Sequence, residues 1–174
     1  MTSAEITKTI WTIGHSTRPI SEFVALLQSF QIKTLADIRA YPGSAKHPQF
    51  NKPELEHSLI SAGIAYLHLR DLGGRRKPRP DSKNTIWKNT SFRGYADYME
   101  TDDFLTAVRQ LEVLALTSFT AMMCSEAVWW RCHRALVSDY LKLQGWQVLH
   151  IMNEDKVTEH PFTQPARDNQ GKLF

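Results

Sequence analysis

Both cysteines of the chain, Cys124 and Cys132, lie within one stretch of eleven residues that ends at Arg134. The stretch also holds a carboxylate, an imidazole and two guanidiniums, on Glu126, His133, Arg131 and Arg134. A thiolate beside guanidinium groups would be a nucleophile, and the guanidiniums could bind an anionic ligand. We therefore interpret residues 124–134 as the floor of a ligand site.

The elements on either side must position this stretch. Residues 119–124 are apolar and predict a buried strand, and about 131–143 predict a helix. Cys124 would then lie where a strand meets a helix N-terminus, and the helix dipole and the nearby guanidiniums would favour its thiolate. Residues 132–134 would lie in the first helical turn, where free backbone N–H groups bind anions.

Other uses of these residues stay open at this point. The two thiols could simply be small buried hydrophobes, as free cysteines often are. A metal site on Cys124, Cys132 and His133 would need a fourth ligand such as His15, and the spacing is not that of the paired cysteines in zinc fingers. We therefore expect no metal. The spacing from Cys124 to Arg131 does not fit a cysteine phosphatase loop either.

Strands and helices alternate along the rest of the chain. This order predicts a single-domain, three-layer α/β/α fold with a mostly parallel sheet, Rossmann-like or flavodoxin-like. The chain is too short for an eight-fold barrel, which takes about 250 residues. The predicted strands are 9–14, 32–38, 64–69, 119–124 and 146–151, and the predicted helices are 19–30, 53–63, 91–99, 102–116 and about 131–143.

Three segments of the predicted domain, residues 1–174, lie outside these elements. We expect residues 1–8 to be a flexible N-terminus. Residues 71–91 form the longest irregular segment, and a loop of this length in a compact domain is usually functional or disordered; we expect a functional loop. The polar tail 153–174 should pack on the body, either as a hairpin around 168–171 or simply wrapped over it.

Polar residues collect where the predicted strands end. In open α/β sheets, ligands bind beyond the carboxyl ends of the strands, so we expect these groups to face one pocket. The groups are His15, Asp37, Arg39, His68, Gly73, Gly74, Arg75, Cys124, Glu126, His150 and Asn153.

Each of these groups also has a purely structural interpretation. Asp37 and Arg39 could form an ion pair that serves only the fold. His68 and His150 lie in apolar strands, where hydrogen-bonded core histidines are more common than catalysts. The glycine pair at 73–74 resembles a phosphate-binding turn but lacks the spacing of a P-loop or a dinucleotide fingerprint.

Composition sets bounds on the partners. The net charge of +3 is compatible with an anionic ligand or with nucleic acid but requires neither. The basic run 75–79 is either a solvated loop or a lid over an anion or a nucleic-acid backbone. Trp129 and Trp130 are either part of the core or a stacking platform for a base.

No apolar run approaches the roughly 20 residues that span a bilayer, and we see no secretion signal. We therefore expect a cytoplasmic protein with no membrane partner and with reduced cysteines.

Several local motifs are specific enough to suggest a family. With these motifs, the chain resembles the bacterial and archaeal domain-of-unknown-function family 488 over about residues 10–166. The motifs are Thr12-Ile13-Gly14-His15-Ser16, Asp37-Ile38-Arg39-Ala40-Tyr41-Pro42-Gly43-Ser44, Pro48-Gln49-Phe50, Leu72-Gly73-Gly74-Arg75, Phe92-Arg93-Gly94-Tyr95-Ala96-Asp97-Tyr98-Met99, Met123-Cys124-Ser125-Glu126, Arg131-Cys132-His133-Arg134 and His160-Pro161-Phe162-Thr163.

The resemblance implies no activity, because the family has no established biochemical role. One departure is Trp129, which stands where a proline is common before the Trp-Arg-Cys-His-Arg run. The family's motif positions coincide with the groups at the strand ends. They correspond here to His15, Asp37, Arg39, Gly73, Gly74, Arg75, Tyr95, Cys124, Glu126, Cys132, His133 and Arg134.

These observations leave three functions open. One is an enzyme for a phosphorylated, nucleotide-like or nucleic-acid-derived substrate, with Cys124, Glu126, His15 and Asp37 as catalytic groups. The second is a non-catalytic nucleotide or nucleic-acid binding module, and the third is a redox sensor that uses the two cysteines. The pattern identifies no cofactor, no reaction and no oligomeric state. The expected anion-binding groups are Arg39, Gly73, Gly74, Arg75, Tyr95, Arg131, Cys132, His133 and Arg134.

Overall fold

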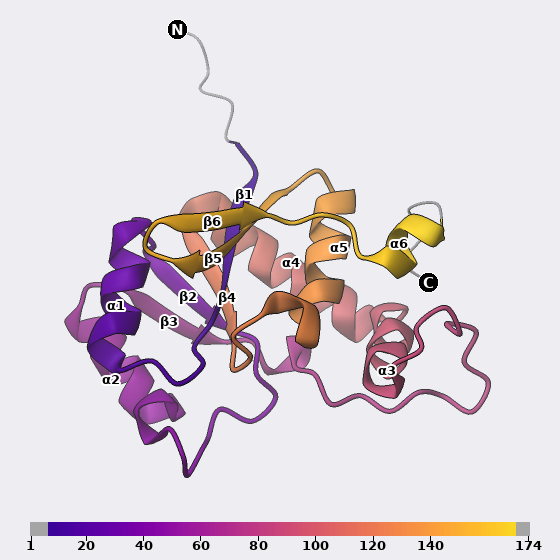
Figure 1. Ribbon diagram of the computed structural model, residues 1–174, viewed down its shortest axis with the longest axis horizontal. Coiled ribbons are helices and arrows are strands. Elements are labelled where there is room, and N and C mark those ends of the chain that lie inside the picture. Colours follow the sequence, from indigo (N-terminus) through magenta and orange to yellow (C-terminus); the bar gives the residue numbers. More distant parts are fainter. Residues whose placement is uncertain (1–6, 170–174) are drawn as a thin grey trace, which may run out of the picture.

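A six-stranded sheet forms the centre of the computed structural model, which describes residues 7–169 (Figure 1). Five strands run parallel, and the sixth pairs antiparallel with its neighbour at one edge. The order across the sheet is β3-β2-β4-β1-β5-β6. The strands are β1 (Thr9–Gly14), β2 (Thr34–Asp37), β3 (Ala65–His68), β4 (Thr120–Cys124), β5 (Gln147–Asn153) and β6 (Lys156–Glu159).

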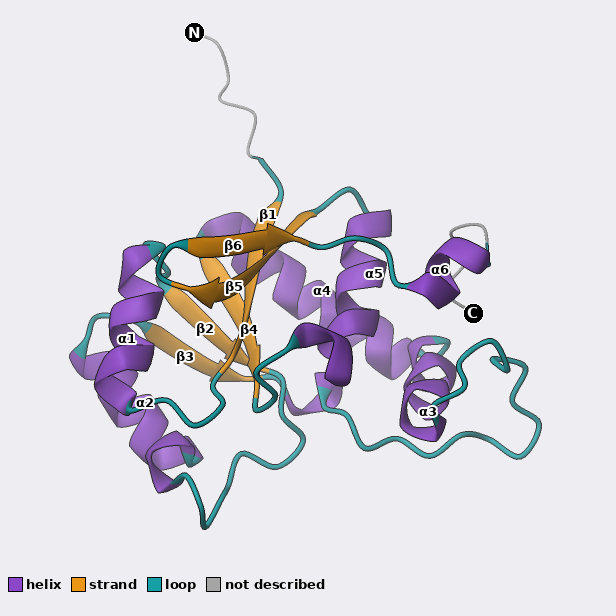
Figure 2. Ribbon diagram, in the orientation of Figure 1, coloured by secondary structure: helices purple, strands orange, loops and turns teal. Residues whose placement is uncertain are grey.

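Helices cover both faces of this sheet (Figure 2). One face carries α1 (Ile20–Ser29) and α2 (Lys52–Ser61), and the other carries α3 (Thr90–Met99), α4 (Asp102–Thr117) and α5 (Arg134–Leu143). The remaining elements are the short helix α6 (Gln164–Asp168) and the 3₁₀ turns η1 (Pro48–Phe50), η2 (Arg70–Leu72) and η3 (Trp129–Arg131). No helix between residues 7 and 169 combines the length and apolarity needed to cross a bilayer.

The predicted three-layer α/β/α class is confirmed. The strand order differs from both named types, because β4 lies between β1 and β2. The chain moves from β1 outward to β2 and β3, then returns through α3 and α4 to place β4 beside β1. The ends of β1, β2 and β4 are therefore adjacent, and the loops that follow them share one edge of the sheet.

The apolar strands fill two cores, one on each face. Met122 belongs to the core under α3, α4 and α5, whereas the next residue, Met123, belongs to the core under α1 and α2. Successive side chains of a strand point to opposite faces, so a strand covered on both faces must be apolar throughout. All five residues of β4 are buried, which agrees with this rule.

One helix boundary predicted from the sequence is wrong. The helix expected from about 131 begins at Arg134, because residues 129–131 form a 3₁₀ turn and Cys132 is extended. A hairpin around 168–171 was one of the two alternatives for the tail; α6 extends to Asp168, residues 170 and 171 lie outside the described part of the chain, and a hairpin joins β5 to β6 instead. Residues 170–174 lie outside the described part of the chain, as do residues 1–6 of the expected flexible N-terminus.

The long segment after β3 is held by one buried carboxylate. Asp97 of α3 accepts hydrogen bonds from the backbone N–H of Arg79 at 2.8 Å, the hydroxyl of Ser82 at 2.7 Å and the amide of Asn84 at 2.6 Å. Burial opposes ionisation of Asp97, but the hydrogen bonds from Asn84 and Ser82 outweigh it and lower its pKa. The segment is therefore fixed on α3.

Candidate functional site

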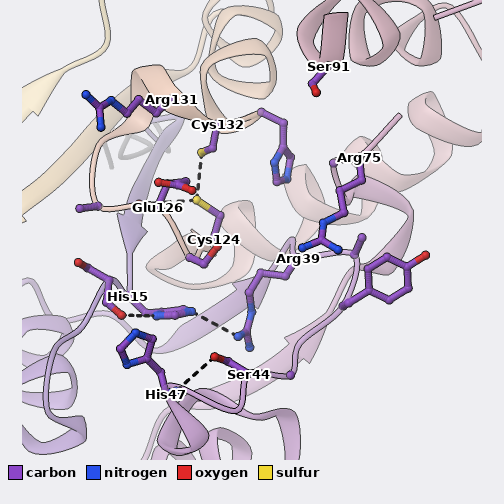
Figure 3. A pocket seen from close by; sticks show the side chains of 18 of the residues that line it. His15, Arg39, Ser44, His47, Arg75, Ser91, Cys124, Glu126, Arg131 and Cys132 are labelled. Atoms are coloured by element: carbon purple, nitrogen blue, oxygen red, sulfur yellow. Dashed lines mark hydrogen bonds between the residues drawn. The ribbon is translucent and has the colours of Figure 1, made fainter. Parts of the chain in front are cut away.

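A cavity of about 670 Å³ opens beyond the ends of β1, β2 and β4 (Figure 3). Of the residues predicted to form a site, ten line it: His15, Arg39, Gly74, Arg75, Tyr95, Cys124, Glu126, Arg131, Cys132 and His133. Asp37, Gly73 and Arg134 do not line the cavity, nor do His68, His150 and Asn153. The remaining lining residues are Ser16, Thr17, Ala40, Tyr41, Gly43, Ser44, His47, Ser91, Phe92, Ser125 and Ala127.

The two cysteines meet at the floor of this cavity. The Sγ atoms of Cys124 and Cys132 lie 3.0 Å apart, and both thiols are free. Burial raises the pKa of the Cys124 thiol well above its ordinary value, and its hydrogen bond to Cys132 raises it further. Burial also opposes ionisation of Cys132, but the hydrogen bond from Cys124 and the charge of Arg134 lower its pKa to about 6. These shifts, together with the contact from Arg134, favour Cys132 over Cys124 as the thiolate of the pair.

Arg134 lies beneath the thiols rather than in the cavity. Its Nε donates to the Sγ of Cys132 at 3.4 Å, and its Nη2 donates to the backbone carbonyl of Glu126 at 2.7 Å. The residue is only 1% exposed, and no ion pair joins it to a carboxylate within residues 7–169. Burial disfavours the charge, but the two cysteines outweigh that effect and raise the pKa of Arg134. The Cys132 sulfur is thus the group that could balance the charge of this buried guanidinium.

Gly14, which the sequence analysis did not count among the site residues, shapes the turn that follows β4. A Cβ on Gly14 would lie 1.7 Å from the carbonyl oxygen of Glu126, the same oxygen that accepts from Arg134. Only glycine allows the turn after β4 to approach the end of β1 so closely. The signal in the sequence was a glycine directly before His15 at a strand end. The Glu126 side chain itself is exposed at the rim.

The carboxylate of Asp37 orients the guanidinium of Arg39. The carboxylate accepts from Nε of Arg39 at 2.9 Å and from its Nη2 at 2.7 Å, and Tyr66 donates its hydroxyl to the same group at 2.6 Å. Asp37 is fully buried. The ion pair considered from the sequence is therefore formed, and it presents the guanidinium of Arg39 to the cavity.

His15 is neutral in this setting. Its Nδ1–H donates to the carbonyl of Ser16 at 2.8 Å, which leaves Nε2 to accept from Arg39 at 3.4 Å. Burial, together with the charge of Arg39, lowers the pKa of His15 to about 4. The ring also stacks on Phe50, with centroids 4.2 Å apart. His15 is thus suited to accept a hydrogen bond, and its low basicity disfavours a role as general base for this predicted catalytic group.

His133 forms the opposite wall and is also neutral. Its Nε2–H donates to the carbonyl of Ile38 at 2.9 Å, and burial lowers its pKa to about 4. Its Nδ1 edge faces Gly74, where a Cβ would lie 2.9 Å from that nitrogen. Tyr95 packs against the ring with centroids 5.2 Å apart and donates its hydroxyl to the carbonyl of Leu72 at 2.7 Å. Gly74 therefore lets the loop lie directly on His133.

The neighbouring glycine has a packing role. A Cβ on Gly73 would lie 2.6 Å from the Cα of Ala40, so this glycine lets the loop after β3 contact the loop after β2. Arg75 follows with a φ of 62°, in the left-handed region that is unusual for a side chain of this size. Its guanidinium lies 5.6 Å from the ring centroid of Tyr41. Two glycines and one unusual backbone conformation thus place Arg75 at the rim.

Sequence reasoning missed the polar residues of the loop after β2. Ser44, His47 and Tyr41 line the cavity, although the sequence analysis counted none of them among the site residues. The Ser44 hydroxyl accepts from the backbone N–H of His47 at 3.2 Å, and Ser44 N–H donates to the side chain of Asn51 at 2.6 Å. The Pro42-Gly43 turn was the available signal, because it returns the chain toward the strand ends.

The other strand-end groups have structural partners. The Nε2–H of His68 donates to the carbonyl of Arg39 at 2.7 Å. His150 is fully buried and lies 2.6 Å from the hydroxyl of Thr12. Asn153 accepts from the backbone N–H of Asp155 in the β5–β6 turn. Among residues 7–169, no three His, Cys, Asp or Glu side chains are grouped so that they could hold a metal ion.

A second, apolar groove of about 370 Å³ adjoins the cavity. Phe92 lines both, and Trp129 and Trp130 precede Arg131 of the cavity in the η3 turn. Trp130 is 51% exposed, whereas one face of Trp129 is covered by the ring of His150 at 4.8 Å. The remaining lining residues are Ile86, Trp87, Lys88, Asn89, Ala135, Pro161, Phe162, Thr163, Gln164, Pro165 and Arg167.

Comparison with known proteins agrees with the resemblance seen in the motifs. The family model described as "Domain of unknown function DUF488" matches residues 19–141. The chain therefore belongs to the DUF488 family, and the two cysteines, Asp37 and Arg39 lie within the matched range. No curated protein and no solved structure gives a significant match.

Proposed function

We propose that this DUF488 chain is a thiol-dependent enzyme that acts on a phosphorylated, nucleotide-like or nucleic-acid-derived substrate. The observation that carries the proposal is the Cys132 sulfur, which is paired with the buried guanidinium of Arg134 and opens onto a basic cavity. A buried charge without a partner is costly, so such a guanidinium stabilises a thiolate at neutral pH. Thiolates are the reactive form of cysteine.

Cys132 is the better nucleophile of the two thiols. Its pKa is lowered to about 6, whereas the pKa of Cys124 is raised. In the proposed reaction the Cys132 sulfur attacks an electrophilic centre of the substrate and displaces a leaving group. In the second step Glu126, which is exposed at the rim of the cavity, activates a water that releases the product. This assignment gives Cys124 the role of a hydrogen-bond donor to the nucleophile.

The charge of the cavity supports an anionic substrate. Arg39, Arg75 and Arg131 line it together with the histidines, and Glu126 is the one acidic residue among its lining residues. Guanidinium groups bind phosphate with paired hydrogen bonds. Asp37 uses the Nε and Nη2 of Arg39, so its Nη1 remains for His15 or a ligand.

The adjoining groove supports the nucleotide-like part of the proposal. It offers aromatic surface directly beside the basic cavity, with Phe92 shared between the two. A nucleobase stacks on aromatic side chains whatever its sequence, and stacking contributes about 1–3 kcal/mol per base. A substrate with its phosphate near Arg131 could thus place its base near Trp130.

A substrate panel tests the proposal. Wild type, Cys132→Ala and Arg75→Ala would be incubated with nucleotides, short oligonucleotides and phosphate esters, and product formation would be followed by chromatography. We expect turnover of at least one compound by wild type and none by Cys132→Ala. Arg109→Ala is the matched control, because Arg109 is an exposed arginine of α4 outside the cavity. If no compound is consumed and no anion raises the melting temperature, the proposal fails.

The half-exposed Trp130 favours a second candidate, a non-catalytic nucleic-acid binding module. In that case Trp130 and the basic residues beside the groove, Lys88 and Arg167, would bind a single strand. Binding would weaken steeply with salt, because neutralised phosphates release counter-ions. The enzyme and the binding module can be separated by measuring oligonucleotide binding to wild type and Trp130→Ala at several salt concentrations. The binding module requires binding without turnover. Binding that is absent or insensitive to salt excludes it.

A further inference from the structure

A continuous chain of hydrogen bonds runs from the buried guanidinium through the sheet to α5. The Nη1 of Arg134 donates to the hydroxyl of Thr12 at 3.1 Å, and that hydroxyl lies 2.6 Å from Nδ1 of His150. The Nε2 of His150 lies 2.8 Å from Nδ1 of His160. The Nε2 of His160 in turn lies 2.8 Å from a carboxylate oxygen of Asp139. Five side chains from β1, α5, β5 and the segment after β6 are thereby linked.

With both imidazoles neutral, one arrangement of protons satisfies every atom. Asp139 can only accept, so His160 donates from Nε2 and accepts at Nδ1. His150 must then donate from Nε2 and accept at Nδ1, and the hydroxyl of Thr12 must donate to it. The oxygen of Thr12 is left to accept from Arg134, which can only donate. Every bond therefore points from Arg134 toward Asp139.

Burial supports a neutral His150 within this chain of hydrogen bonds. Thr12, His150 and Asp139 are fully buried, and His160 is 1% exposed. Burial, followed by the nearby His160 and Arg134, lowers the pKa of His150 far below its ordinary value. The far end is also fixed, because the backbone N–H and the hydroxyl of Thr163 donate to Asp139 at 3.0 and 2.6 Å.

Trp129 completes the enclosure. Its ring stacks on His150 with centroids 4.8 Å apart and an interplanar angle of 7°, and its edge packs against His160 at 4.8 Å. The same residue begins the η3 turn that leads to Cys132. The histidine pair is thus shielded by the segment that carries the reactive sulfur.

We infer that Thr12, His150, His160 and Asp139 form a positioning relay, which orients Arg134 so that its guanidinium holds Cys132 as a thiolate. The inference rests on the proposed thiol chemistry. None of the four side chains lines the cavity, so they are positioning residues and not catalytic ones. By committing its proton to His150, Thr12 presents a lone pair to Nη1, and this fixes the rotation of the guanidinium.

Other ionisable groups near Cys132 must be kept constant in a test. Arg134 of α5 and Cys124 of β4 contact the sulfur directly, and Tyr95 of α3 also interacts with it electrostatically. Thr12 is the relay member whose change removes the link to Arg134 and leaves all three of these groups in place.

The test measures the rate of Cys132 alkylation by iodoacetamide from pH 5 to pH 9.5, with the alkylated residue identified by mass spectrometry. Thr12→Val removes the hydroxyl at nearly constant shape, and Thr12→Ser restores it. We expect wild type and Thr12→Ser to show the same low apparent pKa. Thr12→Val should raise that pKa by about one unit, so its rate at pH 5.5 falls about tenfold while its rate at pH 9.5 is unchanged. Loss of packing alone would not move the midpoint.

Nitrogen NMR of the wild-type histidines provides the second measurement, which does not depend on a folded variant. We expect His150 to carry its proton on Nε2 and to remain neutral at pH 6. A Thr12→Val profile that superimposes on wild type, or a proton on Nδ1 of His150, would overturn the relay. Neither measurement needs a substrate. If no compound of the substrate panel is consumed, the proposed enzyme function fails, but the result for the relay is unaffected.

Discussion

The guanidinium Nε of Arg134 lies 3.4 Å from the Sγ of Cys132, and within residues 7–169 no carboxylate pairs with that guanidinium. A buried arginine without a counter-ion would be strongly destabilising. A thiolate on Cys132 would supply the missing counter-charge, so the proposed reactive form of this thiol would also stabilise the fold. Reactivity and folding are coupled at this contact.

The two thiols should differ sharply in reactivity. In Cys124→Ser the hydroxyl can still donate to Cys132, so alkylation of Cys132 should retain an apparent pKa near 6. In Cys132→Ser the remaining thiol has a raised pKa, and its alkylation at pH 7 should be at least about tenfold slower. Rates of iodoacetamide labelling check this. Equal rates for the two variants would contradict the assignment of the thiolate to Cys132.

Mild peroxide should join the two sulfurs. They are 3.0 Å apart, and a disulfide needs about 2.05 Å, so a small movement is sufficient. Peroxide would oxidise the Cys132 thiolate to a sulfenic acid, and the thiol of Cys124 would displace water to form the disulfide. Mass spectrometry of wild type should show the loss of two hydrogens. Cys124→Ser should instead retain a sulfenic acid on Cys132, which dimedone traps. If wild type also keeps the sulfenic acid and forms no disulfide, the result would argue against the redox-sensor alternative.

The rim of polar groups could be predicted because parallel strands end at a common edge. His15, Arg39 and Cys124 lie at the carboxyl ends of three different strands, and the structure brings all three to one cavity. The position of Arg134 could not be predicted in the same way. The sequence around Arg134 was compatible with an exposed helical turn. The structure shows that Arg134 is buried, in contact with Thr12 and Cys132.

The start of α5 was misplaced for a related reason. Tryptophan, arginine and cysteine are all tolerated in a helix, so the residues at 129–132 contain no local stop signal. In the structure Cys132 has φ −139° and ψ 172°, and this extended backbone turns its sulfur back to Cys124. β6 was missed because its residues are mostly exposed and polar, which removes the alternation that identifies a half-buried strand.

Gly14 should be intolerant of any side chain. Gly14→Ala would place a Cβ 1.7 Å from the backbone carbonyl of Glu126, and backbone cannot move aside as a flexible side chain can. We expect a loss of roughly 1–3 kcal/mol in the free energy of unfolding, the usual range for overpacking. Gly43→Ala is the matched control, because its Cβ would meet only the side chain of Asn51 at 4.0 Å. Urea denaturation compares them, and equal midpoints would show that the turn is not as close as described.

Asp97 should fix the 79–84 part of the long segment only while it is ionised. Its pKa is lowered in the folded state, so its stabilisation is complete above the ordinary value of 3.8 and is lost as the pH falls below that value. Asp97→Asn should abolish this pH dependence and destabilise the protein by about 1–3 kcal/mol, because hydrogen bonds to a charged acceptor are lost. Limited proteolysis at pH 7 should then cut the segment faster, whereas Asp81→Asn, at an exposed position, should behave as wild type.

Arginine at the rim should determine how strongly the cavity binds anions. Arg75 is exposed and free of a carboxylate partner among the ion pairs of residues 7–169, so a bound phosphate would gain its full hydrogen-bonding capacity. We expect inorganic phosphate to raise the melting temperature of wild type and of the control Arg109→Ala. In Arg75→Ala the apparent Kd for phosphate should increase by roughly tenfold, since one charge-assisted hydrogen bond contributes about 1.5–3 kcal/mol before solvent screening reduces it.

Added sodium chloride should weaken phosphate binding to wild type more than phosphate binding to Arg75→Ala, because one fewer charge is screened in the variant. Identical phosphate titrations for the two proteins would place the anion away from Arg75 and leave Arg39 and Arg131 as its partners.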